Sequence, residues 1–448
     1  MSEPIGRDRL AEIADSALKV GADGVQVLVF HSWGGLTRFA SSRIHQNTWR
    51  EDVEFRVTAV VDGNRTGVTS THSFDEASVR RAAEEAVAIA RVAPGDPDFP
   101  GLAPPTDATK PATFDEATAN ATPSERAAGV AAALGEFPGD MEGAGYVETV
   151  ADEVLISSTT GLRLYGSTTR AGVSVLAIAP DSSGYAERLE RRFADLDAAT
   201  LARRAVDKAE RSRDPQPVDP GAYTVILEPA ATSTLIQFLG YIGFGAKSFT
   251  EGRSFMTGKI GEKLASDLVT IVDDPVAPDA LGLPFDFEGT PARRVVLIDR
   301  GTAAAVVWDR TTAAKGSTES TGHALPPPNP YGPMPLNLRM EPGSSTIDEM
   351  VASTERGLLV TRFHYSNVVN EKETVLTGMT RDGTFLIEDG RIARGVKNLR
   401  YTQNALEALA NIEAIGDHTE ISTELFFGGS RAPAIKVRDF KFSSSTTH

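Results

Sequence analysis

Residues 53–70 read VEFRVTAVVDGNRTGVTS, and they predict a β-hairpin that decides the fold of the first half of the chain. At residues 53–61, apolar side chains alternate with mostly polar neighbours, which is typical of a half-buried strand. The sequence Asp-Gly-Asn follows at residues 62–64, and Gly and Asn tolerate the positive φ angles of a tight turn. We therefore expect the return strand at residues 67–70.

A long helix is expected directly after this hairpin, at residues 74–92. Ser73 is the predicted N-cap, and Glu76 three residues later would complete a capping box. A helix at residues 7–19 and a strand at residues 25–30 are expected before the hairpin, from their apolar spacing.

A similar strand–turn–strand–helix succession recurs between residues 173 and 209. Strands are expected at 173–178 and 185–189, and the helix after them repeats the Arg-Arg-Ala triplet of residues 80–82 at residues 203–205. Internal duplication, with both copies in one sheet, is one interpretation. Chance similarity between two amphipathic helices is the other.

Proline and glycine divide the chain into an N-terminal and a C-terminal part. We expect an α+β domain at residues 1–215, with a proline-rich connector at about 94–111, and a domain boundary near 211–220. Residues 221–448 then predict a β-rich, barrel-like domain with an apolar helix at 231–241. Its clearest strands are expected at residues 223–227, 268–272, 294–298, 358–363, 384–387 and 434–437.

Charge and composition exclude several classes of protein. The 448-residue chain has a formal net charge of −16, and such an acidic surface disfavours binding to nucleic acids. The sequence contains no cysteine, which excludes disulfides, thiolate metal ligands and a cysteine nucleophile. Residues 1–4 do not resemble a secretory signal, and no apolar run predicts a membrane helix. We therefore expect a cytoplasmic protein.

A series of sequence blocks carries a resemblance to a known family. These blocks lie at residues 255–262, 268–275, 286–291, 308–313, 320–324, 357–361 and 385–390. The N-terminal half fits more loosely, through Gly21-Ala22-Asp23 and the turn at residues 62–63. In their order and spacing, the blocks resemble the TldD/PmbA family, whose members are also called modulators of DNA gyrase. The resemblance covers nearly the whole chain.

This resemblance implies where a metal site should be sought. In the TldD branch, a His-Glu-x-x-x-His helix binds zinc and supplies the general base, and a cysteine near the C-terminus is a further ligand. Counted without gaps from Gly258, the corresponding positions are Gln237, Phe238 and Ile242. An amide is a poor zinc ligand, and Phe and Ile have no donor atom. The pattern therefore resembles the TldE (PmbA) branch, which lacks the motif and pairs with a TldD subunit.

Two polar clusters are candidates for a groove that binds substrate. His323 follows a glycine and precedes a proline run at residues 326–328, and His364, Tyr365 and Asn367 follow a predicted strand. Contact with a peptide backbone is the functional hypothesis for these four residues, and ordinary loop packing is the alternative.

The sequence therefore predicts a non-catalytic subunit of a TldD/TldE-type metalloprotease that acts on peptides or unfolded proteins. We expect no catalytic residue, metal ligand or cofactor in this chain, zinc in a TldD-like partner, and no activity of the chain alone. A homodimer is expected when the chain is isolated. The alternatives are a stand-alone peptidase that uses residues outside the family motif, and a regulatory or binding protein without enzymatic activity.

Overall fold

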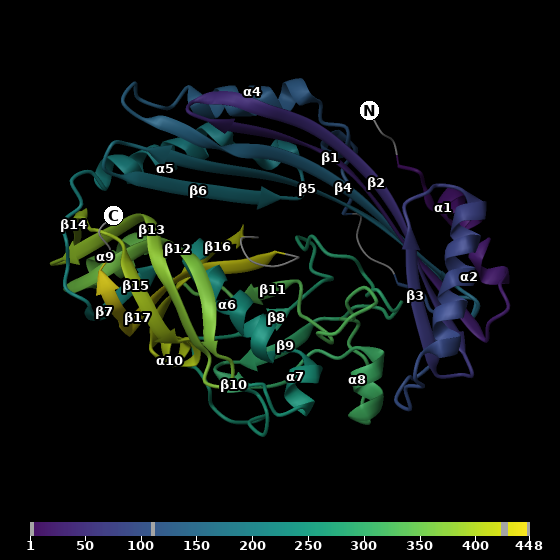
Figure 1. The fold of residues 1–448 in the computed structure, drawn as a ribbon. Coiled ribbons are helices and arrows are strands. Elements are labelled where there is room, and N and C mark those ends of the chain that lie inside the picture. The colour runs from purple at the N-terminus through teal and green to yellow at the C-terminus, as the bar shows by residue number, and fades with distance from the viewer. Residues whose placement is uncertain (1–3, 109–112, 423–428, 446–448) are drawn as a thin grey trace.

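A computed structural model describes residues 4–108, 113–422 and 429–445 and has the expected α+β fold (Figure 1). A long, curved sheet carries helices on its outer face, and the C-terminal part of the chain lies beneath its inner face. Among the described residues, no helix combines the length and the apolar character that crossing a bilayer requires.

The first sheet has six strands, and each pairs antiparallel with its neighbours. In spatial order they are β3 (Arg65–Thr71), β2 (Arg43–Val61), β1 (Gly24–Ala40), β4 (Glu142–Ser158), β5 (Arg163–Ile178) and β6 (Ser183–Glu190). The helices of this half of the chain are α1 (Arg7–Ala14), α2 (Glu76–Val92), α3 (Glu116–Ala119), α4 (Pro123–Leu134) and α5 (Ala198–Arg211), with short 3₁₀ turns η1 (Ala17–Lys19) and η2 (Phe193–Asp195).

The hairpin at residues 53–70 is confirmed as the end of β2, a turn, and β3. Asp62 and Gly63 have φ angles of 53° and 73°, as a tight turn between these strands requires. The predicted cap of the next helix was wrong: Asp75, not Ser73, is the N-cap of α2, because its carboxylate accepts a hydrogen bond from the Ser78 amide at 2.8 Å. The sheet itself is longer than expected, since β1 continues ten residues beyond the predicted strand, to Ala40.

The internal duplication is visible in the structure. The succession β1-β2-β3-α2 recurs as β4-β5-β6-α5, and the two copies meet in the middle of the sheet through β1 and β4. Gly67 of β3 and Gly184 of β6 are equivalent, because a Cβ on either glycine would overlap a carbonyl oxygen of its helix, that of Ala86 or Ala205. These contacts align Ala205 with Ala86. The Arg-Arg-Ala comparison aligned Ala205 with Ala82, one helical turn away.

The C-terminal part forms an eleven-stranded sheet. Its main path is β10 (Thr302–Ala303), β9 (Val295–Asp299), β8 (Ile271–Asp273), β11 (Leu338–Met340), β17 (Ser430–Ser445), β15 (Leu399–Asn404), β13 (Val375–Glu388), β12 (Arg356–Asn370) and β7 (Gly221–Leu227), while β14 (Arg391–Gly395) and β16 (Ile412–Ser422) pair beside it. Strand β17 also pairs with β7, so the path from β17 through β15, β13 and β12 to β7 closes on itself.

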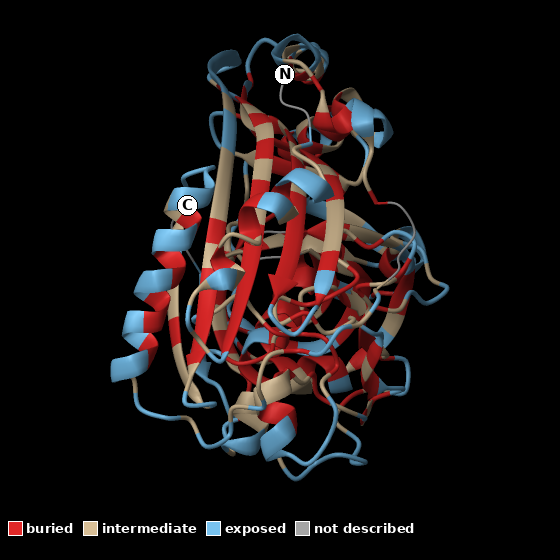
Figure 2. Ribbon diagram, turned by 90° about the vertical axis from the view of Figure 1, so that its right-hand side faces the viewer, coloured by how far each residue is buried: buried red, intermediate tan, exposed pale blue. Residues whose placement is uncertain are grey.

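Helices in this part are mostly short. They are α6 (Pro229–Gly243), α7 (Ala246–Thr250), α8 (Arg310–Lys315), α9 (Ile347–Ala352) and α10 (Ala405–Ala410). Helix α6 confirms the apolar helix predicted at residues 231–241 and contributes much of the buried core. In Figure 2 the middle portions of many strands are buried, whereas the helices on the outside keep an exposed side.

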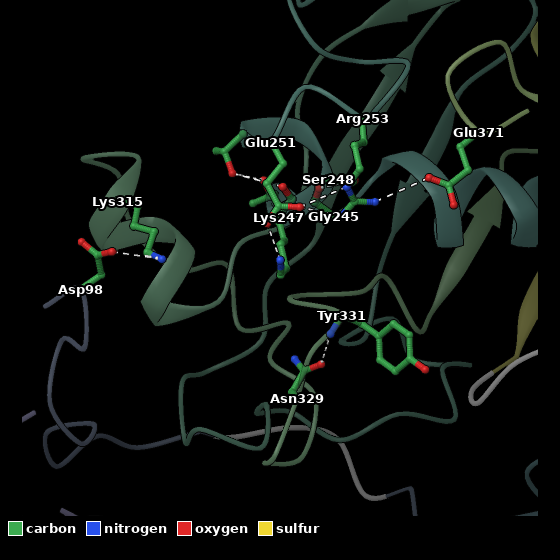
Figure 3. A network of polar contacts seen from close by, with 12 residues as sticks. Asp98, Gly245, Lys247, Ser248, Glu251, Arg253, Lys315, Asn329, Tyr331 and Glu371 are labelled. Carbon is green, nitrogen blue, oxygen red and sulfur yellow. Dashed lines mark hydrogen bonds and ion pairs between the residues drawn. The ribbon is translucent and has the colours of Figure 1, made fainter. Parts of the chain in front are cut away.

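The two sheets are joined by direct contacts. On the inner face of the first sheet, Leu28 and Leu164 pack in one apolar cluster with Phe285 from the C-terminal part. The proline-rich connector is tied to the same region, because Asp98 forms an ion pair with Lys315 of α8 at 3.1 Å (Figure 3). A separate contact joins strand β6 of the first sheet to strand β16, and Ser422 at the end of β16 is in turn hydrogen-bonded to Gln237 of α6.

Candidate functional site

Helix α6 follows β7 in the chain and lies in the interior of the C-terminal part. It packs against β12, β16 and β17, and most of its residues are buried, on all sides of the helix. Two glycines permit this close packing: a Cβ on Gly240 would lie 2.6 Å from the side chain of Leu338, and one on Gly243 would overlap the ring of Phe255. Both glycines therefore lie at close contacts in the core.

Gln237 lies on the side of α6 that faces β16 and β17. Its side-chain nitrogen Nε2 lies 2.7 Å from Ser430 Oγ, 3.1 Å from Ser233 Oγ and 3.2 Å from the carbonyl oxygen of Ser422. Ser233 and Ser430 are also hydrogen-bonded to each other. The Nε2 donor of Gln237 is thus engaged by neutral acceptors, whereas its Oε1 is buried without a hydrogen-bond partner among the described residues.

This network continues into the first sheet through Ser422. The Ser422 hydroxyl donates to Glu187 Oε1 at 2.5 Å, and the Tyr185 hydroxyl donates to Glu187 Oε2 at 2.9 Å. Burial raises the pKa of Glu187, although these hydrogen bonds oppose the shift. Sequence reasoning missed Glu187, Ser422 and Ser430, because residues from three separate strands meet here and no local motif connects them.

Phe238 and Ile242, the other two positions of the expected motif, are packed in the apolar core. Only 4% of Phe238 and 2% of Ile242 is exposed, and both belong to the main hydrophobic cluster of the C-terminal part. Neither side chain offers a donor atom. Among the residues that the structure describes, no three His, Cys, Asp or Glu side chains are grouped so that they could hold a metal ion.

Two ion pairs join helix α5 to the C-terminal part, one at the N-cap of α6 and one on β16. Lys208 of α5 lies 2.6 Å from Glu228, the N-cap of α6, and both side chains are largely buried. Arg204, one helical turn earlier in α5, pairs with Glu420 of β16 at 2.9 Å. Helix α5 therefore connects the outer layer of the first sheet with both α6 and β16.

His323, the first groove candidate, is buried beside strand β8. Its Nε2 lies 2.8 Å from Asp273 Oδ2, and its Nδ1 lies 2.9 Å from both the hydroxyl and the carbonyl oxygen of Thr321. Asp273 accepts a further hydrogen bond from the Asn337 amide at 2.7 Å. Only 6% of His323 is exposed, so both ring nitrogens serve contacts within the protein.

Two more carboxylates lie near this histidine. Burial raises the pKa of Asp286 to about 6, against the hydrogen bonds that it accepts from the Ala324 and Thr290 amides. Burial also raises the pKa of Glu288 to about 8, and the nearby charge of Asp286 adds to this shift. These two residues stand in the family block at residues 286–291, where their spacing could have identified them.

The other groove candidates lie elsewhere, on strand β12. Tyr365 sits at a bulge in the pairing of β12 with β13, has a φ angle of 50°, and is 79% exposed. Asn367 is exposed as well, and His364 is partly buried against the Tyr365 ring, with ring centroids 4.4 Å apart. Burial lowers the pKa of His364, and Arg381 and Arg362 lower it further. The described contacts do not join this group to His323.

A network of polar contacts lies around α7, which follows α6 in the chain (Figure 3). Arg253 lies 2.7 Å from Glu251 and 3.6 Å from Glu371, so it connects the segment after α7 with the turn between β12 and β13. Tyr331, which is 61% exposed, lies in the loop beside α7 and donates its backbone amide to Asn329. These contacts hold the loops beyond α6 together.

Family models account for most of the chain. The model of the PmbA/TldA metallopeptidase C-terminal domain matches residues 220–444, that of the central domain matches residues 102–213, and that of domain 1 matches residues 25–90. Together these ranges include the hydrogen-bond network of Gln237 and the buried group around His323.

Curated relatives are named as metalloproteases. A protein of Methanothermobacter thermautotrophicus named "Metalloprotease" is 28% identical over 66% of this chain and 66% of its own length. A "Metalloprotease TldD homolog" of Haemophilus influenzae is 27% identical over 54% of this chain and 51% of its own. The chain thus matches between about half and just under two-thirds of these relatives' lengths.

Solved structures share the whole fold. TldE from Thermococcus kodakarensis superposes with a TM-score of 0.88 at 20% identity, covering 98% of this chain and 99% of the other. A structure from Thermotoga maritima, described as a modulator of a DNA gyrase, superposes with a TM-score of 0.86 at 21% identity, covering 97% and 100%. From the family models and from this shared architecture, we conclude that the chain belongs to the PmbA/TldD metallopeptidase family.

Proposed function

We propose that this chain is a non-catalytic, TldE-like subunit of a two-subunit metallopeptidase that acts on peptides or unfolded proteins. In this proposal the catalytic zinc ion is held by a TldD-like partner, and this chain completes the complex and contributes to substrate binding.

The observation that carries the proposal is that α6 offers no suitable zinc ligands at the three positions of the expected motif. A hydrolytic zinc ion needs about three protein ligands with nitrogen, oxygen or sulfur donors and an open position for water. At the expected positions, the Gln237 amide is hydrogen-bonded to serine side chains, and Phe238 and Ile242 are apolar and packed in the core. The sequence also has no cysteine to act as a further ligand. The residues present therefore do not fit the metal.

The comparisons support the proposal through the names of similar proteins. The TldE structure from T. kodakarensis is similar over nearly the whole length of both chains, and several relatives carry the name of the TldD branch. An acidic chain with these relatives is better suited to peptide processing than to contact with DNA.

The test is purification from a native lysate with this chain as bait, followed by zinc analysis and a peptide-cleavage assay. We expect a His-Glu-x-x-x-His partner to co-purify, zinc in the partner only, and cleavage by the pair but not by this chain. A pair whose partner carries Gln in place of the motif Glu is the matched control, and it should assemble without cleaving. Stoichiometric zinc and cleavage in this chain alone would support the stand-alone peptidase instead. Binding partners without cleavage would support the regulatory alternative.

The groove hypothesis is tested in the assembled pair. His364→Ala and Tyr365→Ala should raise the KM for a peptide substrate if β12 contacts the substrate, because both side chains lie at the exposed bulge. His323→Ala is informative only together with a stability measurement, since that ring is buried against Asp273. Unchanged KM values for all three variants would refute the hypothesis.

A further inference from the structure

Part of strand β2 lies open at the edge of the first sheet. β2 pairs with β1 along almost its whole length, but β3 covers only residues 55–61 on the other side of β2. Among the described residues no further strand pairs with β2, so residues 43–52 have a neighbouring strand on one side only. Most of these residues are exposed, and in Figure 1 this end of β2 extends past β3. Their outer N–H and C=O groups are therefore free to pair with another strand.

The duplication identifies the equivalent edge in the second repeat, where β5 takes the place of β2. The alignment of Gly67 with Gly184 makes Thr168 of β5 equivalent to Arg50 of β2. β6 covers only residues 171–178 of β5, just as β3 covers only one end of β2. The two repeats therefore leave the same stretch of edge uncovered by their third strand.

An extended segment of the chain, residues 113–115, occupies this edge of β5. Thr113 forms a parallel bridge with Thr168, and the Thr169 amide donates to the Thr113 carbonyl at 3.2 Å. The Thr113 hydroxyl also donates to the Ser167 carbonyl at 3.1 Å. The second repeat thus shows that an extended strand fits at this position. In the described part of the chain, nothing takes the corresponding place on β2.

The other edges of the first sheet are shorter or covered. β6, at the opposite side of the sheet, has eight residues and packs against β13 and β16 of the C-terminal part. β3 has seven residues, and helix α2 packs on it. Short or covered edges are the usual protection against pairing with another chain, and residues 43–52 of β2 lack both devices.

The open edge is basic at its start and acidic at its end. Residues 24–50 include Arg38, Arg43 and Arg50 but no Asp or Glu, in a chain whose net charge is −16. Within the described ranges, none of these three arginines forms an ion pair. Asp52 stands at the other end of the open edge. A strand with opposite charges at its two ends can match an antiparallel copy of itself.

The two charged ends also point to the same side of the sheet. Arg43 pairs with Ala40 of β1, and Asp52 pairs with Ser32. Ala40 and Ser32 are an even number of residues apart, so Arg43 and Asp52 lie on one face. A bulge makes this possible, because His45 is an extra residue of β2 in its pairing with β1.

We propose that residues 43–52 of β2 pair antiparallel with the same residues of a second copy of this chain, which joins the two first sheets into one. In a pair centred on Thr48, the extra residue of the bulge brings Arg43 of one copy opposite Asp52 of the other. The two-fold axis repeats this contact. Asp52, which also lies 2.9 Å from His72, keeps 45% of its side chain exposed and can accept the arginine. This pairing does not depend on the proposed metal-bearing partner.

The test is sedimentation velocity of the full chain over a series of concentrations. The wild type should show a monomer–dimer equilibrium. Arg43→Asp and Asp52→Arg should each raise the Kd of the dimer by about a hundredfold, because two like-charge contacts replace two opposite ones. The double variant with both substitutions should restore the dimer. Arg391→Asp, at an exposed position of β14, is the matched control and should dimerise like the wild type.

Amide hydrogen exchange gives a second measurement that needs no variant. In the wild type, exchange at residues 43–52 should slow as the concentration rises through the Kd, while exchange at residues 113–115 should not change. A wild type that stays monomeric, or a dimer without this protection, would overturn the proposal. So would a folded double variant that remains a monomer. Protection of the edge only on addition of another protein would mean that a different chain covers it, and would overturn the proposal as well.

Discussion

When the two repeats of the first sheet are aligned through Gly67 and Gly184, Glu153 of β4 is equivalent to Gly35 of β1. Glu153 is itself a buried anion, whereas the buried guanidinium of Arg126 lies against Gly35. Glu153 receives hydrogen bonds from four groups, two of them backbone amides that precede α1. Arg126 keeps Nε and Nη2 unpaired among the described residues. The comparison teaches that the two repeats share their strand pairing but hold buried charges of opposite sign where they meet.

The largest loss of stability is expected on substitution of Glu153, the buried carboxylate that accepts hydrogen bonds from four groups. Glu153→Ala removes the acceptor for His31, Tyr165 and two backbone amides, so the free energy of unfolding should fall by about 3–5 kcal/mol. Asp152→Asn, which weakens the partly exposed pair with Arg170, should cost less than about 1 kcal/mol. Urea unfolding of both variants checks this. Equal losses of unfolding free energy in the two variants would contradict the expectation that the buried carboxylate contributes more than the surface one.

A smaller effect is expected where the guanidinium lies on Gly35. Gly35→Ala places a methyl group inside the guanidinium of Arg126 and should cost about 2 kcal/mol in urea unfolding, because the core must shift to accept it. Gly21→Ala is the matched control, since a Cβ there meets nothing within 4 Å. A neutral Gly35→Ala variant would show that the Arg126 guanidinium can move away from Gly35 at little cost.

The pH dependence of the unfolding free energy gives a second test of the buried carboxylate of Glu153. Because hydrogen bonds lower the pKa of Glu153, its contribution to stability is complete above the ordinary glutamate value of 4.5 and is lost as the pH falls through its lower, folded-state pKa. The stability advantage of wild type over Glu153→Gln should therefore shrink during acid titration below pH 4.5. An advantage that is constant with pH would contradict the shift.

Glu187 provides the smallest expected effect, with the opposite sign. Burial raises its pKa, so the stability that it contributes is complete below 4.5 and is lost as the pH rises through its folded-state pKa. Relative to wild type, Glu187→Gln should therefore be more stable near neutral pH than at pH 4. Unfolding curves at the two pH values test the sign. A relative stability that falls towards neutral pH would refute it.

Local patterns in the sequence were sufficient for much of the fold. The turn at residues 62–64 and the apolar helix at residues 231–241 were predicted, because turn residues and apolar runs act on the backbone within a few residues of themselves. The wrong cap at Ser73 shows the limit of such rules, since Asp75 satisfied the same requirement two residues later.

The candidate site was harder to predict, because its contacts join distant parts of the chain. Gln237 could be identified by its position relative to the family blocks, but its partners Ser422 and Ser430 lie almost two hundred residues away. Arg126 stands in an ordinary amphipathic helix, and only the tertiary structure places it over Gly35. Register between distant strands decides such contacts, and a single sequence does not encode it in a local pattern.

The position of strand β17 has a consequence for the order in which the protein assembles during its synthesis. β17 pairs with β7, β11, β15 and β16, so the C-terminal sheet cannot close until residues 430–445 have left the ribosome. The first sheet needs only residues up to 190 and its outer helices up to 211, so it can fold while the remainder is still being translated. During that interval, the exposed apolar face of the unfinished C-terminal part is where a chaperone would be needed most.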